Sequence, residues 1–211
     1  HPDQFPDAAN FPVLKSIPPG NSMEGLLFPD TYFVPVDANA RGVLNTILGE
    51  FYKKVQQYHL DTQAQQHHLS LYQMVILASI VERETRFTQD SPGIASVYWN
   101  RLFIQPNETA GLLQADPTVQ YARDSQTGTK SYWTPLNDKP GNIVPQSPWN
   151  TYTFKGLPPT PICSPSLASL QAAAAPPKTN YFYFLAKSDG HTVFATTYTE
   201  FQQDEQKYLN Q

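Results

Sequence analysis

A continuous apolar stretch in the middle of the chain limits most strongly what this sequence can fold into. Residues 74–81 read Met-Val-Ile-Leu-Ala-Ser-Ile-Val, and a helix of these residues has no face suited to water. Ser70 and Gln73 have the spacing of a capping box, which starts a helix. The run is too short to cross a bilayer, which takes about 20 apolar residues. The sequence therefore predicts a buried central helix over residues 70–84.

Around this helix, the chain alternates shorter elements with long irregular segments. Proline makes up 20 of the 211 residues, nearly twice the usual share, which favours loop-rich connections. We therefore expect an α+β protein, mostly helical, with a small antiparallel sheet or hairpin and long Pro-rich loops. The capping and apolar spacing predict helices over 38–58 (capped by Asp37), 91–101, a short stretch after Asp116, 166–175 and 200–209, and strands over 181–187 and 191–197.

Charge and residue spacing exclude several classes of function. The net charge is −4 and Lys and Arg form no block, whereas nucleic-acid binding needs clustered cations. His59, His67 and His68 lie on a polar stretch without a carboxylate at metal-ligand spacing. A Gly-rich phosphate loop and a serine-nucleophile elbow are also absent from the sequence. We therefore expect no nucleic-acid partner, no metal and no cofactor.

Two carboxylates, Glu82 and Glu84, end the apolar helix. A carboxyl group beside so much apolar surface loses hydration, which raises its pKa toward the range of a general acid. Helical geometry turns the two side chains about 200° apart, so only one of them can face a given cleft. The other should pair with Arg83 or Arg86, or reach solvent. Because both flanks of the helix are apolar, periodicity does not decide which glutamate faces the cleft.

Several blocks of the chain resemble one known family. The run Ala-Ser-Ile-Val-Glu-Arg-Glu-Thr at residues 78–85 is similar to the signature of the YceG-like endolytic murein transglycosylases. Further blocks resemble segments of that family in the same order: residues 24–32, 97–102, 113–119, 150–152 and 156–159, the Ala-rich segment before Pro176, and residues 181–184 and 190–194. Residues 105–110 form a longer turn than the family has before its Leu-Gln block.

The resemblance implies a fold and a domain organisation. In other lytic transglycosylases, a lysozyme-like helix also ends on the catalytic acid, in a Glu-Ser pair that corresponds to Glu84-Thr85 here. We therefore expect residues 24–211 to form one catalytic domain with a lysozyme-like helical core. Residues 1–23 are expected to be an N-terminal extension or linker.

The resemblance also implies a reaction and selects Glu84 as its acid/base. The family cleaves the β-1,4 bond between N-acetylmuramic acid and N-acetylglucosamine within peptidoglycan strands. A protonated Glu84 would donate its proton to the glycosidic oxygen. The resulting carboxylate would then deprotonate the muramic acid C6 hydroxyl, which attacks its own C1 and leaves a 1,6-anhydro end. Because this nucleophile is intramolecular, no second carboxylate is needed.

Substrate-binding side chains are expected from the long loops and the short helix that precedes them. Gln114, Asn150 and Tyr152 carry donors and acceptors suited to sugar hydroxyl and N-acetyl groups. Asp116 can stabilise developing positive charge, although its position before a proline equally suits a helix cap. Thr118 and Tyr121 follow on the same short helix and face either the cleft or the core.

The resemblance further implies a cellular setting. The expected partners are peptidoglycan strands and the cell-wall synthesis machinery. The expected location is the extracytoplasmic face of the bacterial cytoplasmic membrane, reached through an N-terminal anchor that this chain does not contain.

Two alternative functions stay open at this point. The first is a muramidase that uses Glu84 with Asp116 or Glu82 to activate water. The second is a non-catalytic glycan-binding module of the cell-wall synthesis machinery. Hydrolysis would leave a reducing end instead of an anhydro end, and a binding module would release no product.

Overall fold

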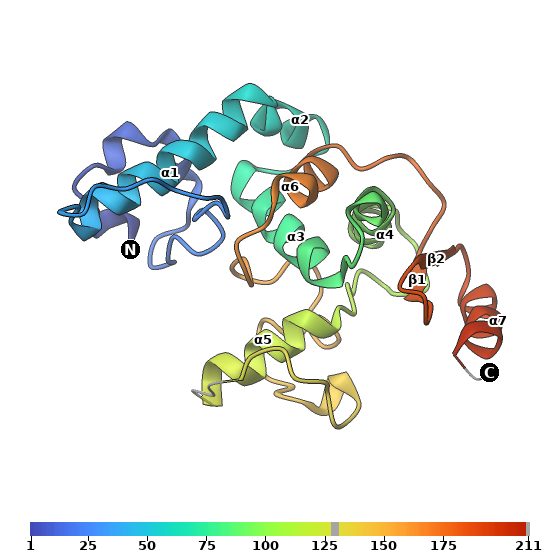
Figure 1. Ribbon diagram of the computed structural model, residues 1–211. Helices are drawn as coiled ribbons and strands as arrows, with labels where there is room; N and C mark the ends of the chain where they lie inside the picture. Colours follow the sequence, from blue (N-terminus) through green and yellow to red (C-terminus); the bar gives the residue numbers. More distant parts are fainter. Residues whose placement is uncertain (128–130, 210–211) are drawn as a thin grey trace.

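The computed structural model describes residues 1–127 and 131–209 (Figure 1). Within these residues it contains seven α-helices and one two-stranded antiparallel sheet. The expected α+β class is therefore confirmed, while the likeness of its core to lysozyme stays a prediction. The elements are α1 (Ala40–Gln57), α2 (Leu60–Gln66), α3 (Leu71–Glu84), α4 (Ser91–Phe103), α5 (Asp116–Thr127), α6 (Leu167–Ala174), β1 (Tyr183–Ala186), β2 (Thr192–Ala195) and α7 (Tyr198–Tyr208), with short 3-10 turns at Pro2–Gln4, Ala8–Asn10, Pro12–Ser16, Thr88–Asp90 and Pro140–Asn142.

Helix α3 is the centre of the fold, as the apolar stretch predicted. It packs against α2, α4, α5 and α6, which surround it in Figure 1. All its residues from Met74 to Val81 are buried. The capping box is present, because Gln73 N donates to Ser70 Oγ at 3.2 Å and Ser70 N donates to Gln73 Oε1 at 2.9 Å. The helix ends at Glu84, because the next residue, Thr85, adopts an extended conformation while its N–H still donates to Val81 O.

The N-terminal half differs from the sequence-based expectation in two places. Helix α1 begins at Ala40, and its cap is Asn39, whose Oδ1 accepts from Gly42 N at 2.9 Å, rather than Asp37. Helix α2 was not predicted. Its Gln-rich sequence buries only Leu60 and Ala64, so that it shows too little apolar periodicity to be recognised.

The C-terminal hairpin brings aromatic residues beside α4. The strands β1 and β2 are shorter than predicted and pair with Tyr183 opposite Ala195. Gly93 permits this packing, since a Cβ atom there would lie 2.3 Å from Cζ of Phe194. Helix α7 starts at a second capping box, formed by Thr197 and Glu200, and packs on the hairpin at the edge of the molecule (Figure 1).

The first 17 residues contribute to the same core as the rest of the chain. Phe5, Phe11, Val13, Leu14 and Ile17 are buried in the hydrophobic cluster that contains α3. The expected boundary between an extension ending at residue 23 and a catalytic domain stays a prediction, but the core does not stop there.

None of the helices within residues 1–127 and 131–209 has the length and apolar character that crossing a membrane requires. The longest, α1, has 18 residues and carries charged side chains along its length.

Candidate active site

The two glutamates at the end of α3 have different surroundings. Glu82 Oε2 accepts three hydrogen bonds at the start of α6, from Ser166 N at 3.0 Å, Ser166 Oγ at 2.6 Å and Ser169 Oγ at 2.7 Å. A carboxylate at a helix N-terminus satisfies free N–H groups and the positive end of the helix dipole. Arg83, one of the expected partners, instead lies over the ring of Trp133 at 4.1 Å. Glu82 therefore ties α3 to α6.

Replacing Glu82 tests this structural role. Glu82→Ala removes the acceptor of three hydrogen bonds, so we expect a loss of about 2–3 kcal/mol in the free energy of unfolding. Denaturant unfolding measures this loss. We expect the activity per folded molecule to stay within a few-fold of wild type. A variant of wild-type stability that has lost its activity would contradict the assignment.

Glu84 is held differently, by a single tyrosine at the edge of a cavity. Tyr98 Oη donates to Glu84 Oε1 at 2.8 Å. Burial raises the pKa of Glu84 to about 7, and the negative charge of Asp116 adds to the rise, while the Tyr98 hydrogen bond and the cations Arg101 and Arg83 oppose it. A carboxyl group with this pKa can both donate and accept a proton near neutral pH.

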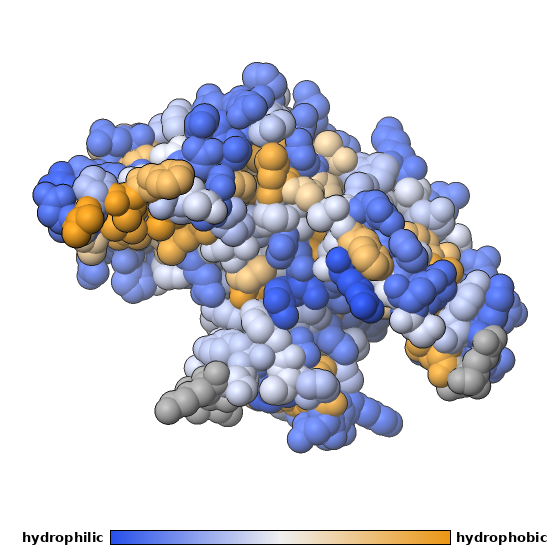
Figure 2. Space-filling view, viewed as in Figure 1, coloured by the Kyte–Doolittle hydropathy of each residue, from blue (hydrophilic) through white to orange (hydrophobic). Residues whose placement is uncertain are grey.

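The cavity beside Glu84 has a volume of about 420 Å³. Figure 2 shows the surface notched between the part that carries α5 and the arm that ends in α7. Five elements (α3, α4, α5, β1 and α7) and the loops on either side of α5 contribute to the lining, which consists of Glu84, Tyr98, Arg101, Gln114, Asp116, Tyr152, Tyr183, Phe184, Tyr198, Phe201 and Glu205. The cavity thus combines carboxylates, one buried cation and many aromatic rings.

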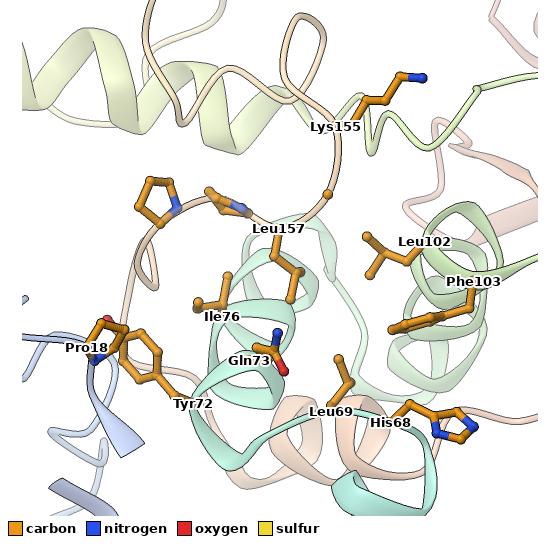
Figure 3. Close-up of a pocket in the computed structure, with 13 residues that line it drawn as sticks. Pro18, His68, Leu69, Tyr72, Gln73, Ile76, Leu102, Phe103, Lys155 and Leu157 are labelled. Atoms are coloured by element: carbon orange, nitrogen blue, oxygen red, sulfur yellow. The ribbon is translucent and has the colours of Figure 1, made fainter. Parts of the chain in front are cut away.

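A larger cavity, of about 490 Å³, lies beside the N-terminal half of α3. Figure 3 shows Tyr72, Ile76, Leu102 and Leu157 around it. Among the described residues that line it, none carries a carboxylate. Acid/base chemistry on a sugar needs such a group, so the smaller cavity at Glu84 is the candidate active site.

Three of the predicted substrate-binding residues line the same cavity as Glu84. Gln114, Asp116 and Tyr152 come from α5 and its flanking loops. Tyr152 Oη donates to Asp116 Oδ1 at 2.7 Å. Gln114 has a φ of 53°, an unusual left-handed conformation for a residue other than glycine. Its N–H donates to Thr151 O at 3.0 Å, which helps hold the strained backbone.

Two predicted contact residues, Thr118 and Asn150, are fully buried and cannot touch a substrate in this structure. Thr118 Oγ1 bonds Ala115 O at 2.7 Å and Thr151 Oγ1 at 2.8 Å. Asn150 Nδ2 donates to two loop carbonyls, and its Oδ1 accepts from Tyr152 N at 3.0 Å. In this structure the polar groups of both residues fix the loop that carries Tyr152, which corresponds to the core alternative for Thr118 and gives Asn150 a positioning role.

Tyr121, the remaining predicted residue, lies outside the cavity. Its Oη donates to Glu24 Oε2 at 2.6 Å, and its ring lies 6.4 Å from that of Trp133 and 6.1 Å from that of Trp149. Trp149 Nε1 in turn donates to Thr160 Oγ1 at 3.0 Å. Tyr121 therefore fastens the long loop after α5 to the body of the protein.

The sequence-based reasoning missed Arg101, which organises the cavity. Arg101 is 6% exposed. Its guanidinium donates to Phe182 O at 2.7 Å and to Leu113 O, and lies 5.3 Å from the ring of Tyr183 and 5.9 Å from that of Tyr98. Tyr98 and Arg101 are three residues apart on α4, a spacing that puts both on one face. That spacing, within a block that resembles the family, was the available signal.

The aromatic residues of β1 and α7 were also missed. The sequence indicated a strand and a polar helix at these positions, without a reason to connect either with Glu84. Among residues 1–127 and 131–209, no three His, Cys, Asp or Glu side chains are grouped so that they could hold a metal ion.

Comparison with known proteins shows which family the chain resembles. The model of the YceG-like family matches residues 3–207. The endolytic murein transglycosylase of Bacillus subtilis (strain 168) is 33% identical over 209 residues, which cover 98% of this chain and 53% of that protein. The protein of the same name from Streptococcus pneumoniae (serotype 2, strain D39) is 27% identical, over 96% of this chain and 36% of that protein.

A solved structure agrees with the sequence comparisons. The crystal structure of a YceG-like protein from Listeria monocytogenes matches with a TM-score of 0.68 and 31% identity, covering 86% of this chain and 55% of that one. The chain spans about half the length of the Bacillus protein and of the Listeria structure.

Proposed function

Because this chain belongs to the YceG-like family, we propose that it is an endolytic lytic transglycosylase of peptidoglycan. It would cleave the β-1,4 bond between N-acetylmuramic acid and N-acetylglucosamine within glycan strands. The name that the Bacillus and Streptococcus relatives carry, endolytic murein transglycosylase, supports the substrate and the reaction class. The observation that carries the assignment is Glu84, on an open cavity at the end of the central helix with its pKa raised to about 7.

In the proposed reaction, Glu84 acts first as an acid and then as a base. Protonated Glu84 donates its proton to the glycosidic oxygen while the bond to C1 of the muramic acid breaks. The carboxylate then takes the proton of the C6 hydroxyl, whose oxygen bonds C1 and closes a 1,6-anhydro ring. The nucleophile belongs to the substrate itself, so its effective concentration is high and no water has to be activated.

The surrounding residues support these steps. Tyr98 holds Glu84 Oε1 and thereby leaves Oε2 for the substrate. Asp116, oriented by its hydrogen bond from Tyr152, would stabilise the positive charge that develops at C1. Gln114 would bind hydroxyl or N-acetyl groups through its side-chain amide. Thr118, Asn150 and Tyr121 act by positioning the loop and not by contact with sugar.

Hydrolysis remains the second candidate, because a second carboxylate lies in the cavity. Asp116 and Glu84 line it together, which is the pairing that an enzyme activating water needs. Glu82 is not part of such a pair, since its carboxylate is occupied at the start of α6. A non-catalytic binding module is the third possibility, and it requires that the wild-type protein release no product.

Product analysis tests the proposed function. The protein is incubated with purified, uncrosslinked peptidoglycan strands, and the new ends are identified by mass spectrometry. We expect internal fragments that end in 1,6-anhydro-muramic acid. Reducing ends would favour the hydrolase, and a complete lack of products would contradict both enzymatic readings.

The pKa of Glu84 leads to a pH dependence with a definite sign. Glu84 must be protonated to act as an acid, so kcat/KM should fall above about pH 7. The Tyr98 hydrogen bond lowers the pKa of Glu84, so Tyr98→Phe should raise that pKa and move the fall to higher pH. A profile of kcat/KM against pH measures this shift.

Tyr121→Phe is the matched control for this shift, because it removes a tyrosine–carboxylate hydrogen bond outside the cavity. Its profile should coincide with that of wild type. A Tyr98→Phe profile that moves to lower pH, or does not move, would show that Tyr98 does not set the protonation of Glu84.

The substrate also suggests where the protein works. Peptidoglycan lies outside the cytoplasmic membrane, so we propose that the domain acts on the extracytoplasmic face, held by an N-terminal anchor beyond residues 1–211 and near the cell-wall synthesis machinery. The family resemblance supports this location. Fractionation of cells that express the full-length protein tests it, with recovery in the cytosol as the contradicting result.

A further inference from the structure

The part of the cavity wall formed by β1 and α7 consists of aromatic rings that the proposed mechanism leaves unused. Tyr183 lies 5.7 Å from Tyr198 and 5.6 Å from Phe201, measured between ring centroids. Tyr198 and Phe201 lie 6.1 Å apart and are nearly parallel, at 24°. We call these three residues the aromatic wall.

The aromatic wall joins a buried ring to two rings at the surface, since Tyr183 is only 7% exposed whereas Tyr198 and Phe201 belong to α7. Tyr198 is 49% exposed, and none of the described residues of α7 is buried. Helix α7 packs on β1 and β2 at the margin of the fold. Its rings therefore contribute surface to the cavity more than they contribute burial to the core.

Glu108 holds the aromatic wall in place from the turn at residues 105–110. Its Oε2 accepts from Tyr183 Oη at 2.8 Å and from Tyr198 N at 2.9 Å. On its other side, Tyr183 faces the Arg101 guanidinium at 5.3 Å. A ring fixed by two neighbouring charged groups offers a ligand a pre-organised surface, which lowers the entropy cost of binding.

On the basis of the proposed function, we propose that the aromatic wall is a binding subsite for an N-acetylglucosamine residue next to the scissile bond. A β-linked glucosamine ring directs its polar substituents outward around its edge and leaves C–H groups on its two faces. Such a face packs on an aromatic ring, whose negative π-surface attracts the C–H groups. Gln114, Asp116 and Tyr152, in the same cavity, offer polar partners for the edge of the sugar.

Two carboxylates near the aromatic wall, those of Glu205 and Asp116, favour the uncharged sugar for this subsite. Glu205 follows Phe201 by one helical turn and lines the cavity with Glu84 and Asp116. Muramic acid carries carboxylates on its peptide stem or, where the stem is absent, on its lactyl group, and these two side chains would repel them. N-acetylglucosamine carries no charge, so it meets the aromatic wall without that cost.

Binding of a neutral oligosaccharide tests the subsite separately from cleavage. The probe is the β-1,4-linked hexamer of N-acetylglucosamine, titrated by calorimetry against the Glu84→Gln protein, in which turnover is removed. Adding Phe201→Ala or Tyr198→Ala should each weaken binding about tenfold, as expected for the loss of an aromatic packing partner. Phe201→Tyr should restore binding close to that of the parent.

Tyr208→Ala is the matched control, because Tyr208 is a tyrosine on the same helix that lies outside the lining of the cavity. We expect its binding to stay within about twofold of the parent, that is, within about 0.4 kcal/mol. Equal weakening by Tyr208→Ala would assign the effect to the stability of α7 and would overturn the subsite.

The failures of the two proposals can be distinguished. If wild type cleaves strands but Phe201→Ala leaves hexamer binding unchanged, or the parent does not bind the hexamer, the subsite is wrong and the proposed function stands. If wild type neither cleaves strands nor binds the hexamer, both are wrong.

Discussion

Glu84→Gln is expected to lower the rate of strand cleavage by about 10³- to 10⁴-fold, the upper part of the range for loss of a general acid/base. Glutamine keeps the shape of the side chain and can still accept from Tyr98, but it can neither give nor take a proton. Since the proposed mechanism uses the same carboxyl group in both steps, no second residue can replace it. The measurement is the initial rate of formation of new strand ends.

The stability of Glu84→Gln distinguishes a catalytic from a structural role. The pKa of Glu84 rises from an ordinary 4.5 to about 7 in the folded protein, so the folded state holds the proton more tightly than the unfolded state. Below about pH 4.5 both states are protonated and the glutamate has no net effect. As pH rises from about 4.5 to about 7, Glu84 ionises more readily in the unfolded state than in the folded state, which lowers the free energy of unfolding. Above pH 7 this loss is no more than about 3 kcal/mol.

Glu84→Gln should therefore be more stable than wild type at about pH 8 and similar to it at about pH 4, as measured by thermal unfolding. Glu82→Gln provides the matched control, with the same chemical change two residues earlier, and we expect it to retain most of the activity. An inactive Glu84→Gln protein that is also less stable than wild type at both pH values would contradict a direct catalytic role.

The second large effect is expected at Arg101. Arg101→Ala should lower the free energy of unfolding by about 3–5 kcal/mol. The buried guanidinium donates to the carbonyls of Leu113 and Phe182, and its loss leaves both acceptors without this partner. The substitution also removes the side chain between the rings of Tyr98 and Tyr183. Denaturant unfolding measures the loss, and the activity should fall with it because α4, β1 and the Gln114 turn are no longer tied together.

Arg83→Ala is the control for this effect. Arg83 lies over Trp133 at 4.1 Å and is exposed, so its removal should cost no more than about 1 kcal/mol. A loss below about 1 kcal/mol at Arg101 as well would show that the arginine does not hold the cavity together.

Local signals in the sequence were enough to predict the central elements of the fold. The capping box at Ser70 and the apolar run after it predicted α3, because both act within one helix. The two strands expected over residues 181–187 and 191–197 form the hairpin, although they are shorter in the structure. Helix α2 escaped because tertiary packing, rather than its own periodicity, stabilises it.

The candidate site could be predicted only in part. The sequence left Glu82 and Glu84 equivalent, and only the family resemblance chose between them. The structure explains the choice, since the hydroxyl groups of Ser166 and Ser169 donate hydrogen bonds to the Glu82 carboxylate. For Asn150 the type of side chain suggested sugar contact, and for Thr118 the sequence left cleft and core open. Which way a polar group points depends on partners far away in the sequence, such as Thr151 for Thr118. The aromatic wall could not be predicted from the sequence for the same reason. Helix α7 lies beside the cavity because it packs on the hairpin, and this contact is not evident from the sequence of α7 alone.

Cleavage of strands in water enriched in heavy oxygen distinguishes the proposed chemistry from hydrolysis in a single reaction. In the proposed mechanism the C6 oxygen of the substrate closes the ring, so the new ends should be 1,6-anhydro-muramic acid that carries no label. All such ends should disappear with Glu84→Gln and remain with Glu82→Gln. Labelled reducing ends that depend on Glu84 would contradict this account, because they would show that water, activated beside Glu84 and Asp116, attacks C1.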